Sequence, residues 1–428
     1  MSENEQVTLG GPQVSGPRTG GPQTARVANA AQDDGGLRAV QADGPRSDGQ
    51  WSARASGQLA ASTQLAPRLS RRRFVALAAG AAMLAATGLA GCSGGSGEEA
   101  ATDAGSAQTG ADDDSADFTG DMREQSISCF YFDTYIDISA ICPEDFLATL
   151  DERMNYFENK FSRTVEGSDI SNINEAGGKP VEVCAETIDI IQQALAYSEE
   201  SGGLFDISIG SVSTLWDFIE GVKPDDAAIQ EGVKHIDYTQ ISVDEEAGTV
   251  TLLDPDMKLD LGGIAKGYIC DDLVGMLDGA GVQNACLSLG GNVYVMGLSY
   301  DGDEWNVGVQ DPNGTYSDAI ASLAARDLSV VTSGLYERYF EQDGETYYHI
   351  LDPKTGYPVE TDLKSVSITC DSSTAADTYA TILFLKGHDA AKELVESDER
   401  FYDGVFIDKD DNISTIEGSE FEVLIDEG

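Results

Sequence analysis

The chain has 428 residues, enough for two domains on length alone, and its formal net charge is −49 at pH 7. So acidic a surface repels nucleic acid at every phosphate and disfavours electrostatic docking on anionic lipid headgroups. Three histidines and seven cysteines without a C-x-x-C pair argue against a His-rich zinc site, a zinc ribbon and a thioredoxin motif. Buried free thiols are the expected state of the cysteines in the folded part, and the sequence leaves disulfides open.

The first 120 residues have the composition of an export and anchoring region. Residues 1–69 are rich in Gly, Ala, Ser, Gln and Pro and lack the apolar residues for a core, so we expect them to be disordered. Residues 70–92 begin with a run of arginines, continue with an uncharged apolar stretch and end in Leu-Ala-Gly before Cys92. This order resembles a twin-arginine signal followed by a lipobox, in which the cysteine is lipidated. We expect residues 93–120 to be a flexible acidic tether between the lipid and the domain.

This region predicts an extracytoplasmic protein that is lipid-anchored to the cell membrane. The 69 residues before the signal are unusual, because a leader normally starts close to its arginines. The sequence leaves two explanations open: a misassigned translational start, or a genuine cytoplasmic extension.

Residues 121–428 alternate strand and helix patterns and form the expected catalytic domain. Residues 126–141 predict one strand, interrupted at Asp133-Thr134, and residues 258–261 predict another. Further strands are predicted at 241–243, 248–253, 285–297 (two strands around a Gly-Gly), 305–310, 328–333, 337–341, 346–351 and 366–370, with those from 285 to 351 as parts of one sheet. Helices are predicted at 143–157, 185–201, 224–233, 264–277 and 373–385. The pattern indicates an α+β fold with a mixed, largely antiparallel sheet packed against helices.

A glycine turn at Gly262-Gly263 separates the predicted strand at 258–261 from the helix that follows. Backbone N–H groups in such a turn and at a helix N-terminus point toward a bound anion. Asp260 and Lys266 flank the turn with opposite charge. Without further motifs, the same residues also fit an ordinary strand–helix turn with two surface charges.

Two later segments carry residues that suit catalysis or metal binding. His349 ends a strand and precedes an Asp-Pro-Lys-Thr-Gly turn, although a lone histidine is often structural. Asp377 and Thr381 lie four residues apart, so both oxygens share one face of an otherwise apolar helix. Two hard oxygen ligands suit magnesium or calcium, and a buried carboxylate at position 377 needs a partner.

In their order along the chain, these segments resemble the FAD:protein FMN transferases, also called the ApbE or flavin transferase family. The segments that carry the resemblance are Asp-Leu-Gly-Gly-Ile-Ala-Lys-Gly-Tyr at 260–268, His-Ile-Leu-Asp-Pro-Lys-Thr-Gly-Tyr-Pro at 349–358 and Ala-Asp-x-x-Ala-Thr at 376–381. The resemblance covers roughly residues 127–425. It implies a magnesium-dependent reaction in which FAD donates FMN to a Thr or Ser hydroxyl of another protein and AMP leaves.

The resemblance also implies a site between two subdomains. The residues implied to contact FAD are Phe132, Leu204, Phe205, Asp206, Asp260, Lys266 and His349. Those implied to hold magnesium are Asp377, Thr381 and the carbonyl of Gly263, and those implied in catalysis are Lys266, His349 and Asp377. Some members carry a further acid where this chain has Ala380, and some carry a tyrosine at Thr164, so these two contacts stay open.

Several points remain open in the sequence. The general base is either His349 or a metal-bound carboxylate. The acceptor is unnamed, with a flavoprotein of a membrane or extracytoplasmic redox chain as the family expectation. Two other functions use the same residues: an FAD-binding lipoprotein without turnover, and a pyrophosphatase that splits FAD with water. The oligomeric state is also open.

Overall fold

The computed structural model describes residues 121–315, 318–416 and 418–424, all of which belong to the compact unit Ser52–Gly428. The predictions for residues 1–69, 70–92 with Cys92, and 93–120 lie outside these residues. No helix in the described part of the chain is long and apolar enough to cross a membrane. All six cysteines within the described ranges are free thiols, in line with the expectation from the sequence.

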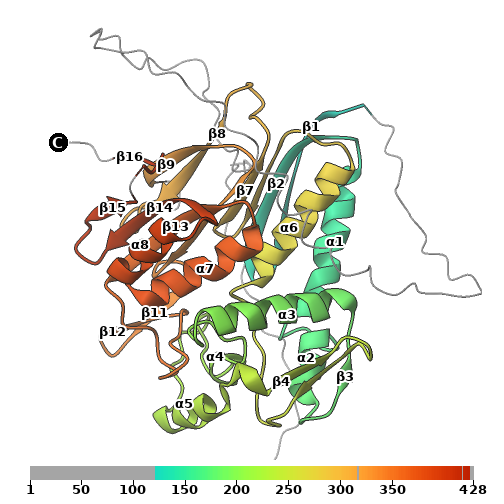
Figure 1. The fold of residues 1–428 in the computed structure, drawn as a ribbon, viewed down its shortest axis with the longest axis vertical. Coiled ribbons are helices and arrows are strands. Elements are labelled where there is room, and N and C mark those ends of the chain that lie inside the picture. The colour runs from blue at the N-terminus through green and yellow to red at the C-terminus, as the bar shows by residue number, and fades with distance from the viewer. Residues whose placement is uncertain (1–120, 316–317, 417, 425–428) are drawn as a thin grey trace, which may run out of the picture. The chain divides into compact units, whose positions relative to one another are not determined.

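The described residues form a large sheet with helices packed against it (Figure 1). The helices are α1 (Phe146–Phe161), α2 (Asp169–Glu175), α3 (Ala185–Glu200), α4 (Gly210–Ser213), α5 (Asp226–Gly232), α6 (Ala265–Gly279), α7 (Ser373–Lys386) and α8 (His388–Ser397). The sheet has eight strands in the order β1-β2-β6-β7-β10-β13-β14-β15, and every neighbouring pair is antiparallel. The predicted α+β class is therefore confirmed.

The strands of the large sheet are β1 (Arg123–Tyr131), β2 (Thr134–Cys142), β6 (Ala285–Leu289), β7 (Asn292–Met296), β10 (Leu328–Gly334), β13 (Leu363–Cys370), β14 (Phe401–Asp408) and β15 (Ile413–Thr415). One face carries α1, α6, α7 and α8 (Figure 1). A small sheet of β8 (Trp305–Gln310), β9 (Ala319–Ala325) and β16 (Glu422–Val423) shares a second apolar cluster with strands β7, β10 and β14. Strands β7, β10 and β14 of the large sheet are thus covered on both faces.

A second subdomain lies below the α6 and α7 helices in Figure 1. It holds α2, α3, α4, α5 and a three-stranded sheet of β3 (Val181–Glu182), β5 (Thr249–Leu252) and β4 (Ile241–Asp244). Short 3-10 turns at Val233–His235 and Tyr238–Gln240 complete it. A separate hairpin of β11 (Tyr339–Gln342) and β12 (Glu345–Tyr348) packs through Phe340 and Tyr347 against Trp216.

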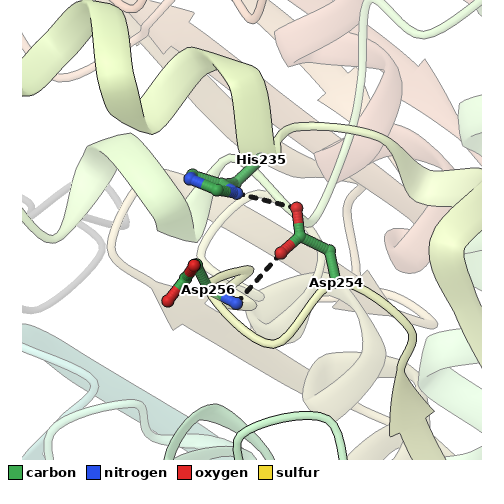
Figure 2. A group of neighbouring side chains, drawn as sticks. All are labelled: His235, Asp254 and Asp256. Carbon is green, nitrogen blue, oxygen red and sulfur yellow. Dashed lines mark hydrogen bonds and ion pairs between the residues drawn. The ribbon is translucent and has the colours of Figure 1, made fainter.

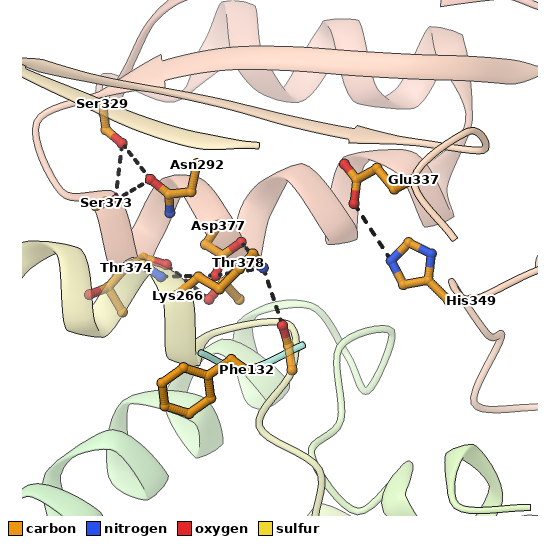
Figure 3. A network of polar contacts seen from close by, with 12 residues as sticks. Phe132, Lys266, Asn292, Ser329, Glu337, His349, Ser373, Thr374, Asp377 and Thr378 are labelled. Carbon is orange, nitrogen blue, oxygen red and sulfur yellow. Dashed lines mark hydrogen bonds and ion pairs between the residues drawn. The ribbon is translucent and has the colours of Figure 1, made fainter. Parts of the chain in front are cut away.

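Helix α7 is held at its N-terminus by a carboxylate from α6. Asp271 accepts hydrogen bonds from the backbone N–H groups of Ser373 at 2.8 Å and Thr374 at 2.9 Å. A carboxylate at this position satisfies donors that have no partner within the helix and complements the helix dipole. Ser373 also donates to Asn292 of β7 at 2.7 Å, so the first turn of α7 is fixed to both α6 and the sheet (Figure 3).

Five strand predictions need correction. Residues 126–141 form two strands, because Phe132 and Asp133 both have positive φ (54° and 57°) and make the two-residue turn of a hairpin. Residues 258–261 are not a strand; only Lys258 makes an isolated bridge, to Ile209. The residues of β11 and β12 do not continue the large sheet, since they pair only with each other, and β8 belongs to the small sheet.

Candidate functional site

The N-terminus of α6 and the middle of α7 meet at a buried ion pair. The Asp377 side chain is 6% exposed, and Lys266 Nζ lies 3.1 Å from its Oδ1. Its Oδ2 accepts a hydrogen bond from the backbone N–H of Gly267 at 3.0 Å. A Cβ on Gly267 would lie 2.7 Å from Thr374 Cα and 2.8 Å from Asp377 Cβ, so only glycine permits this crossing. The prediction that Asp377 is buried and partnered is confirmed.

The two other predicted metal ligands lie next to one another. A Cβ placed on Gly263 would be 3.8 Å from Thr381 Oγ1 and 3.0 Å from Phe205 Cε2. The fold therefore brings the glycine turn, the hydroxyl of Thr381 and the ring of Phe205 to one place. Phe205 is one of the residues predicted to contact the flavin. Ala380 is fully buried in the core, so it faces away from solvent. A carboxylate, a hydroxyl and a backbone carbonyl are hard oxygen donors, and this set fits magnesium.

Asp260 is placed in the same turn but is already well bonded. Its Oδ1 accepts from the backbone N–H of Gly262 at 2.9 Å, and its Oδ2 accepts from Ser213 Oγ at 2.6 Å. Arg163 Nε lies 3.1 Å from Oδ2. These contacts hold the glycine turn in its conformation and attach it to α4. In this structure Asp260 therefore stabilises the turn. Its predicted contact with FAD stays a prediction.

Asp206, from the predicted flavin-contacting segment Leu204-Phe205-Asp206, lines an open cavity at the second subdomain. The cavity has a volume of ≈ 380 Å³, and its lining includes Asp206, Tyr238, Pro353 and Lys354. The fold thus brings the predicted flavin segment beside the Asp-Pro-Lys-Thr-Gly turn. The carboxylate of Asp206 accepts from Ser208 and from the backbone N–H of Tyr238, and burial raises its pKa. Asp206 therefore also stabilises the wall of this cavity.

Phe132 lies at the tip of the β1–β2 hairpin, where three hydrogen bonds hold it in the left-handed region. Its N–H donates to Glu158 Oε1 at 3.0 Å. Arg338 Nη2 donates to the carbonyls of Phe132 at 3.3 Å and Asp133 at 2.9 Å. Positive φ is costly for an aromatic residue, and such strain persists only where the surroundings impose it. Arg338 thus ties the hairpin tip to the strand pair that carries His349.

His349 follows β12 and faces Glu337, a residue that sequence reasoning assigned to a strand and did not single out (Figure 3). Its Nε2 lies 3.8 Å from Glu337 Oε2, while its Nδ1 is buried without a hydrogen-bond partner among the described residues. Partial burial, with Arg338 and Lys266 nearby, lowers the pKa of His349 to about 4. Partial burial also raises the pKa of Glu337 to about 7. The sequence carries no spacing signal for this pair.

A second group of possible ligands lies elsewhere, in the second subdomain (Figure 2). His235 Nδ1 lies 2.7 Å from Asp254 Oδ2, and Asp254 Oδ1 accepts from the backbone N–H of Asp256 at 3.0 Å. The imidazole of His235 and the carboxylate of Asp254 thus pair with each other, and the same carboxylate also accepts the hydrogen bond that closes the turn. Asp256 is exposed. An ion pair that closes a turn explains this group, so we do not assign it to the functional site.

Comparison with known proteins gives the family. A sequence model of the ApbE family matches residues 132–405. The chain belongs to the ApbE family. It is 37% identical over 249 residues to an FAD:protein FMN transferase of Klebsiella pneumoniae (strain 342), a match that covers 58% of this chain and 77% of that relative. The predicted family, and with it the prediction of a transferase enzyme, are confirmed.

Further relatives agree with this membership. An FAD:protein FMN transferase of Treponema pallidum (strain Nichols) is 40% identical over 239 residues, covering 52% of this chain and 65% of the relative, so the chain spans less than two thirds of its length. The crystal structure of the ApbE protein of Thermotoga maritima matches at 32% identity with a TM-score of 0.63, covering 69% of this chain and 97% of that one. The flavin transferase ApbE of Vibrio cholerae matches in fold, with 24% identity and a TM-score of 0.60, over 69% of this chain and 96% of that one.

Proposed function

We propose that this ApbE-family chain transfers FMN from FAD to a Thr or Ser hydroxyl of an acceptor protein, forming a phosphoester and releasing AMP in a magnesium-dependent reaction. The observation that carries the proposal is the buried pair of Lys266 and Asp377 beside the glycine turn, in a chain whose curated relatives are named FAD:protein FMN transferases. FAD and a protein acceptor follow from those names.

The residues at the turn suit a pyrophosphate. The amine of Lys266 lies at the N-terminus of α6, where backbone N–H groups and the helix dipole favour an anion. Its ion pair with Asp377 fixes the amine in place before substrate arrives. Asp260 holds the turn in shape through the N–H of Gly262. A preorganised positive group of this kind stabilises charge that develops as a phosphate leaves.

We propose that magnesium is held by Asp377, Thr381 and the carbonyl of Gly263. A bound magnesium ion would supply Lewis-acid polarisation of the phosphates. The fit rests on the donor types and on the closeness of Gly263 to Thr381 Oγ1. Thr381 has no side-chain hydrogen bond within the described residues, which leaves its oxygen free for such a contact.

The segments on the other side of the turn suit the flavin end of FAD. We propose that Phe132, Leu204 and Phe205 contact the ring system, with Phe205 packed beside Gly263. The hydrogen bonds of Arg338 and Glu158 fix Phe132 before substrate binds. Rigid placement of the contact residues lowers the entropy lost on binding.

The test is incubation of the full chain with FAD and magnesium, with and without a candidate acceptor domain. A mass increase equal to FMN on the acceptor, with AMP released in equal amount, is the expected outcome. Release of FMN and AMP without acceptor would instead favour a pyrophosphatase. Tight FAD binding with no AMP in either mixture would favour a binding protein without turnover.

For the location, we propose export and lipid anchoring through Cys92, with an acceptor that belongs to a membrane or extracytoplasmic redox chain. The support is the order of arginines, apolar run and Leu-Ala-Gly-Cys in residues 70–92. Expression with Cys92→Ala should move the protein from the membrane to the soluble extracytoplasmic fraction. Unchanged membrane fractionation of that variant would contradict the anchor.

A further inference from the structure

Strand β1 is an edge strand of the large sheet (Figure 1). It stands first in the order of that sheet, so among the described strands only β2 pairs with it. The pairing runs without a bulge over all nine residues of β1, and residues 125–131 include no charged residue and no proline. Native sheets usually protect an edge with charges, prolines, bulges or a very short strand. Along residues 125–131, β1 has none of these protections.

Alternate residues of β1 point their backbone groups away from β2. The N–H of Ile141 in β2 donates to the carbonyl of Asn284 at 2.9 Å, so Ile141 faces β6 and its partner Glu124 faces outward. The residues of β1 that face outward in this way are Glu124, Ser126, Ser128 and Phe130. Their N–H and C=O groups have no backbone partner among the described residues. They can therefore pair with an extended segment of another chain, as in strand addition.

The same hairpin carries two exposed aromatic rings near its tip. The Phe130 side chain is 55% exposed and that of Tyr135 is 75% exposed. The two rings meet edge to face, with their centroids 5.2 Å apart. They lie on the face of the sheet opposite α1, since the next residue, Tyr131, donates its hydroxyl to Asp151 of α1. Two large rings left exposed together are typical of a surface that binds another protein.

The charges around the two rings favour a basic partner. Arg123 pairs with Glu144, and the other charged residues of the hairpin 123–142 are all acidic: Glu124, Asp133 and Asp137. Asp133 is exposed at the turn, and Asp137 lies on the same face as Tyr135. Aromatic rings beside carboxylates bind the side chain of Lys or Arg through cation–π and ionic contacts.

The free edge ends beside the proposed catalytic site. Strand β1 leads into the turn at Phe132, where Arg338 donates to the carbonyls of Phe132 and Asp133. The carbonyl of Arg338 in turn accepts a hydrogen bond from the N–H of His349 at 3.1 Å. A segment paired along β1 would thus have one end close to the turn that is tied to His349. The hydroxyl of a protein acceptor has to reach this part of the molecule.

We propose that the outer edge of β1, together with Phe130 and Tyr135, is the docking surface for the acceptor protein. This inference rests on the proposed function. An extended segment of the acceptor adds to β1 as an outer strand, and a Lys or Arg of that segment contacts the two rings and Asp133. The hydroxyl that receives FMN lies just past the paired stretch, at the turn that holds Phe132. Backbone pairing supplies affinity, and the rings and carboxylates supply selectivity.

The first test compares two substitutions at Ser128 in the full chain, with FAD, magnesium and an acceptor domain that the wild-type chain labels. Ser128→Pro removes an outward N–H and keeps the ladder with β2, since proline is tolerated where the N–H of an edge strand faces solvent. It should raise the KM for the acceptor about 10-fold, with kcat and the KM for FAD unchanged. Ser128→Ala is the matched control, because it also loses the bond to Asp137 but keeps the N–H, and it should behave as the wild type.

The second test concerns the side chains. Replacing both rings, by Phe130→Ser with Tyr135→Ser, should raise the KM for the acceptor by about 10-fold or more. Asp133→Asn suits the positive φ of 57° and should raise this KM less, while making it less sensitive to salt. Leu253→Ser, 58% exposed in the second subdomain, is the control and should leave it unchanged. The KM for FAD should stay the same in all of these variants.

Amide hydrogen exchange of the wild-type chain gives a readout that needs no transfer and no variant. The outward amides of β1 should exchange rapidly in the free chain and become protected when the acceptor domain is added without FAD. Protection in the free chain that grows with its concentration would place a second copy on the edge. Protection that is independent of concentration would place the chain's own residues there. Either of these two results would overturn the proposal.

The inference is also overturned if Ser128→Pro and Ser128→Ala have the same KM for the acceptor, or if a bound acceptor leaves the outward amides of β1 unprotected. The exchange measurement decides the matter even where Ser128→Pro fails to fold. If the wild-type chain protects these amides on binding the domain but transfers no FMN to it, the proposed function fails and the docking surface stands.

Discussion

The two halves of the site differ in how completely their polar groups are satisfied. At the α6–α7 crossing, the carboxylate of Asp377 has both oxygens engaged, by Lys266 and by the N–H of Gly267. At the open end of the β11–β12 hairpin, Glu337 and His349 stand 3.8 Å apart and His349 Nδ1 has no partner in the described part of the chain. The first arrangement holds charge in a fixed place, and the second leaves protonation free to change. The contrast is between a carboxylate whose charge is held in place and a pair of groups whose protonation can change.

The largest effect on FMN transfer is expected at the α6–α7 crossing, where Lys266 and Asp377 pair. Asp377→Ala should reduce FMN transfer by more than about 100-fold and abolish its response to magnesium, because it removes the one carboxylate of the proposed metal ligands and leaves Lys266 unpaired. Transfer rates at a series of magnesium concentrations provide the measurement. Glu396→Gln on the exposed face of α8 serves as the control. Unchanged transfer by Asp377→Ala would contradict the proposal that Asp377 is a metal ligand.

The crossing itself can be tested by two glycines of the same helix. Gly267→Ala should destabilise the fold by about 1–3 kcal/mol and slow transfer, because the added methyl meets Thr374 Cα and Asp377 Cβ. Gly275→Ala has nothing within 4 Å and should be neutral or stabilising by up to about 1 kcal/mol. Urea unfolding of both variants checks this. Equal stability of the two would contradict the close approach of α6 and α7.

The raised pKa of Glu337 should make the free energy of unfolding depend on pH. The pKa of Glu337 is raised to about 7 in the folded state, so its favourable contribution is complete below the pKa of the unfolded chain, near 4.5, and is lost as pH rises through 7. Glu337→Gln should therefore gain stability relative to the wild type between pH 5 and pH 8, by about 1–2 kcal/mol after allowing for partial exposure. Urea unfolding at the two pH values measures the difference. A constant difference would show that Glu337 titrates normally.

The smallest effect on stability is expected at Asp271, which lies one helical turn after Gly267 and caps the N-terminus of α7. Asp271→Asn keeps one acceptor oxygen but turns an amide toward the N–H donors of Ser373 and Thr374. We expect a loss of about 1 kcal/mol or less in the free energy of unfolding, as for other helix caps. Asp278→Asn, later in α6, is the control. A larger loss at Asp278 than at Asp271 would argue against the cap.

The local pattern of the chain was enough to predict α6 and α7, the helices that carry Lys266 and Asp377. Glycines at 262 and 263, the apolar helix after them and the spacing of Asp377 and Thr381 are properties of sequence alone, and α6 and α7 lie where that pattern placed them. The family and the α+β class followed from the order of the motifs. The alternation of Leu259 and Leu261 with charged residues predicts a strand at 258–261, but the structure gives these residues only one isolated bridge.

Other features were decided by tertiary structure, because they join residues far apart in the chain. Glu337 lies beside His349 because of the β11–β12 hairpin, and no spacing rule in the sequence connects the two residues. The structural partners of Asp260 and Asp206 depend on α4 and on Tyr238 in the same way. The sequence determined which groups are available and which local elements hold them. Packing determined which groups are buried, which are satisfied and which are left free to react, because burial and pairing depend on neighbours that local sequence does not specify.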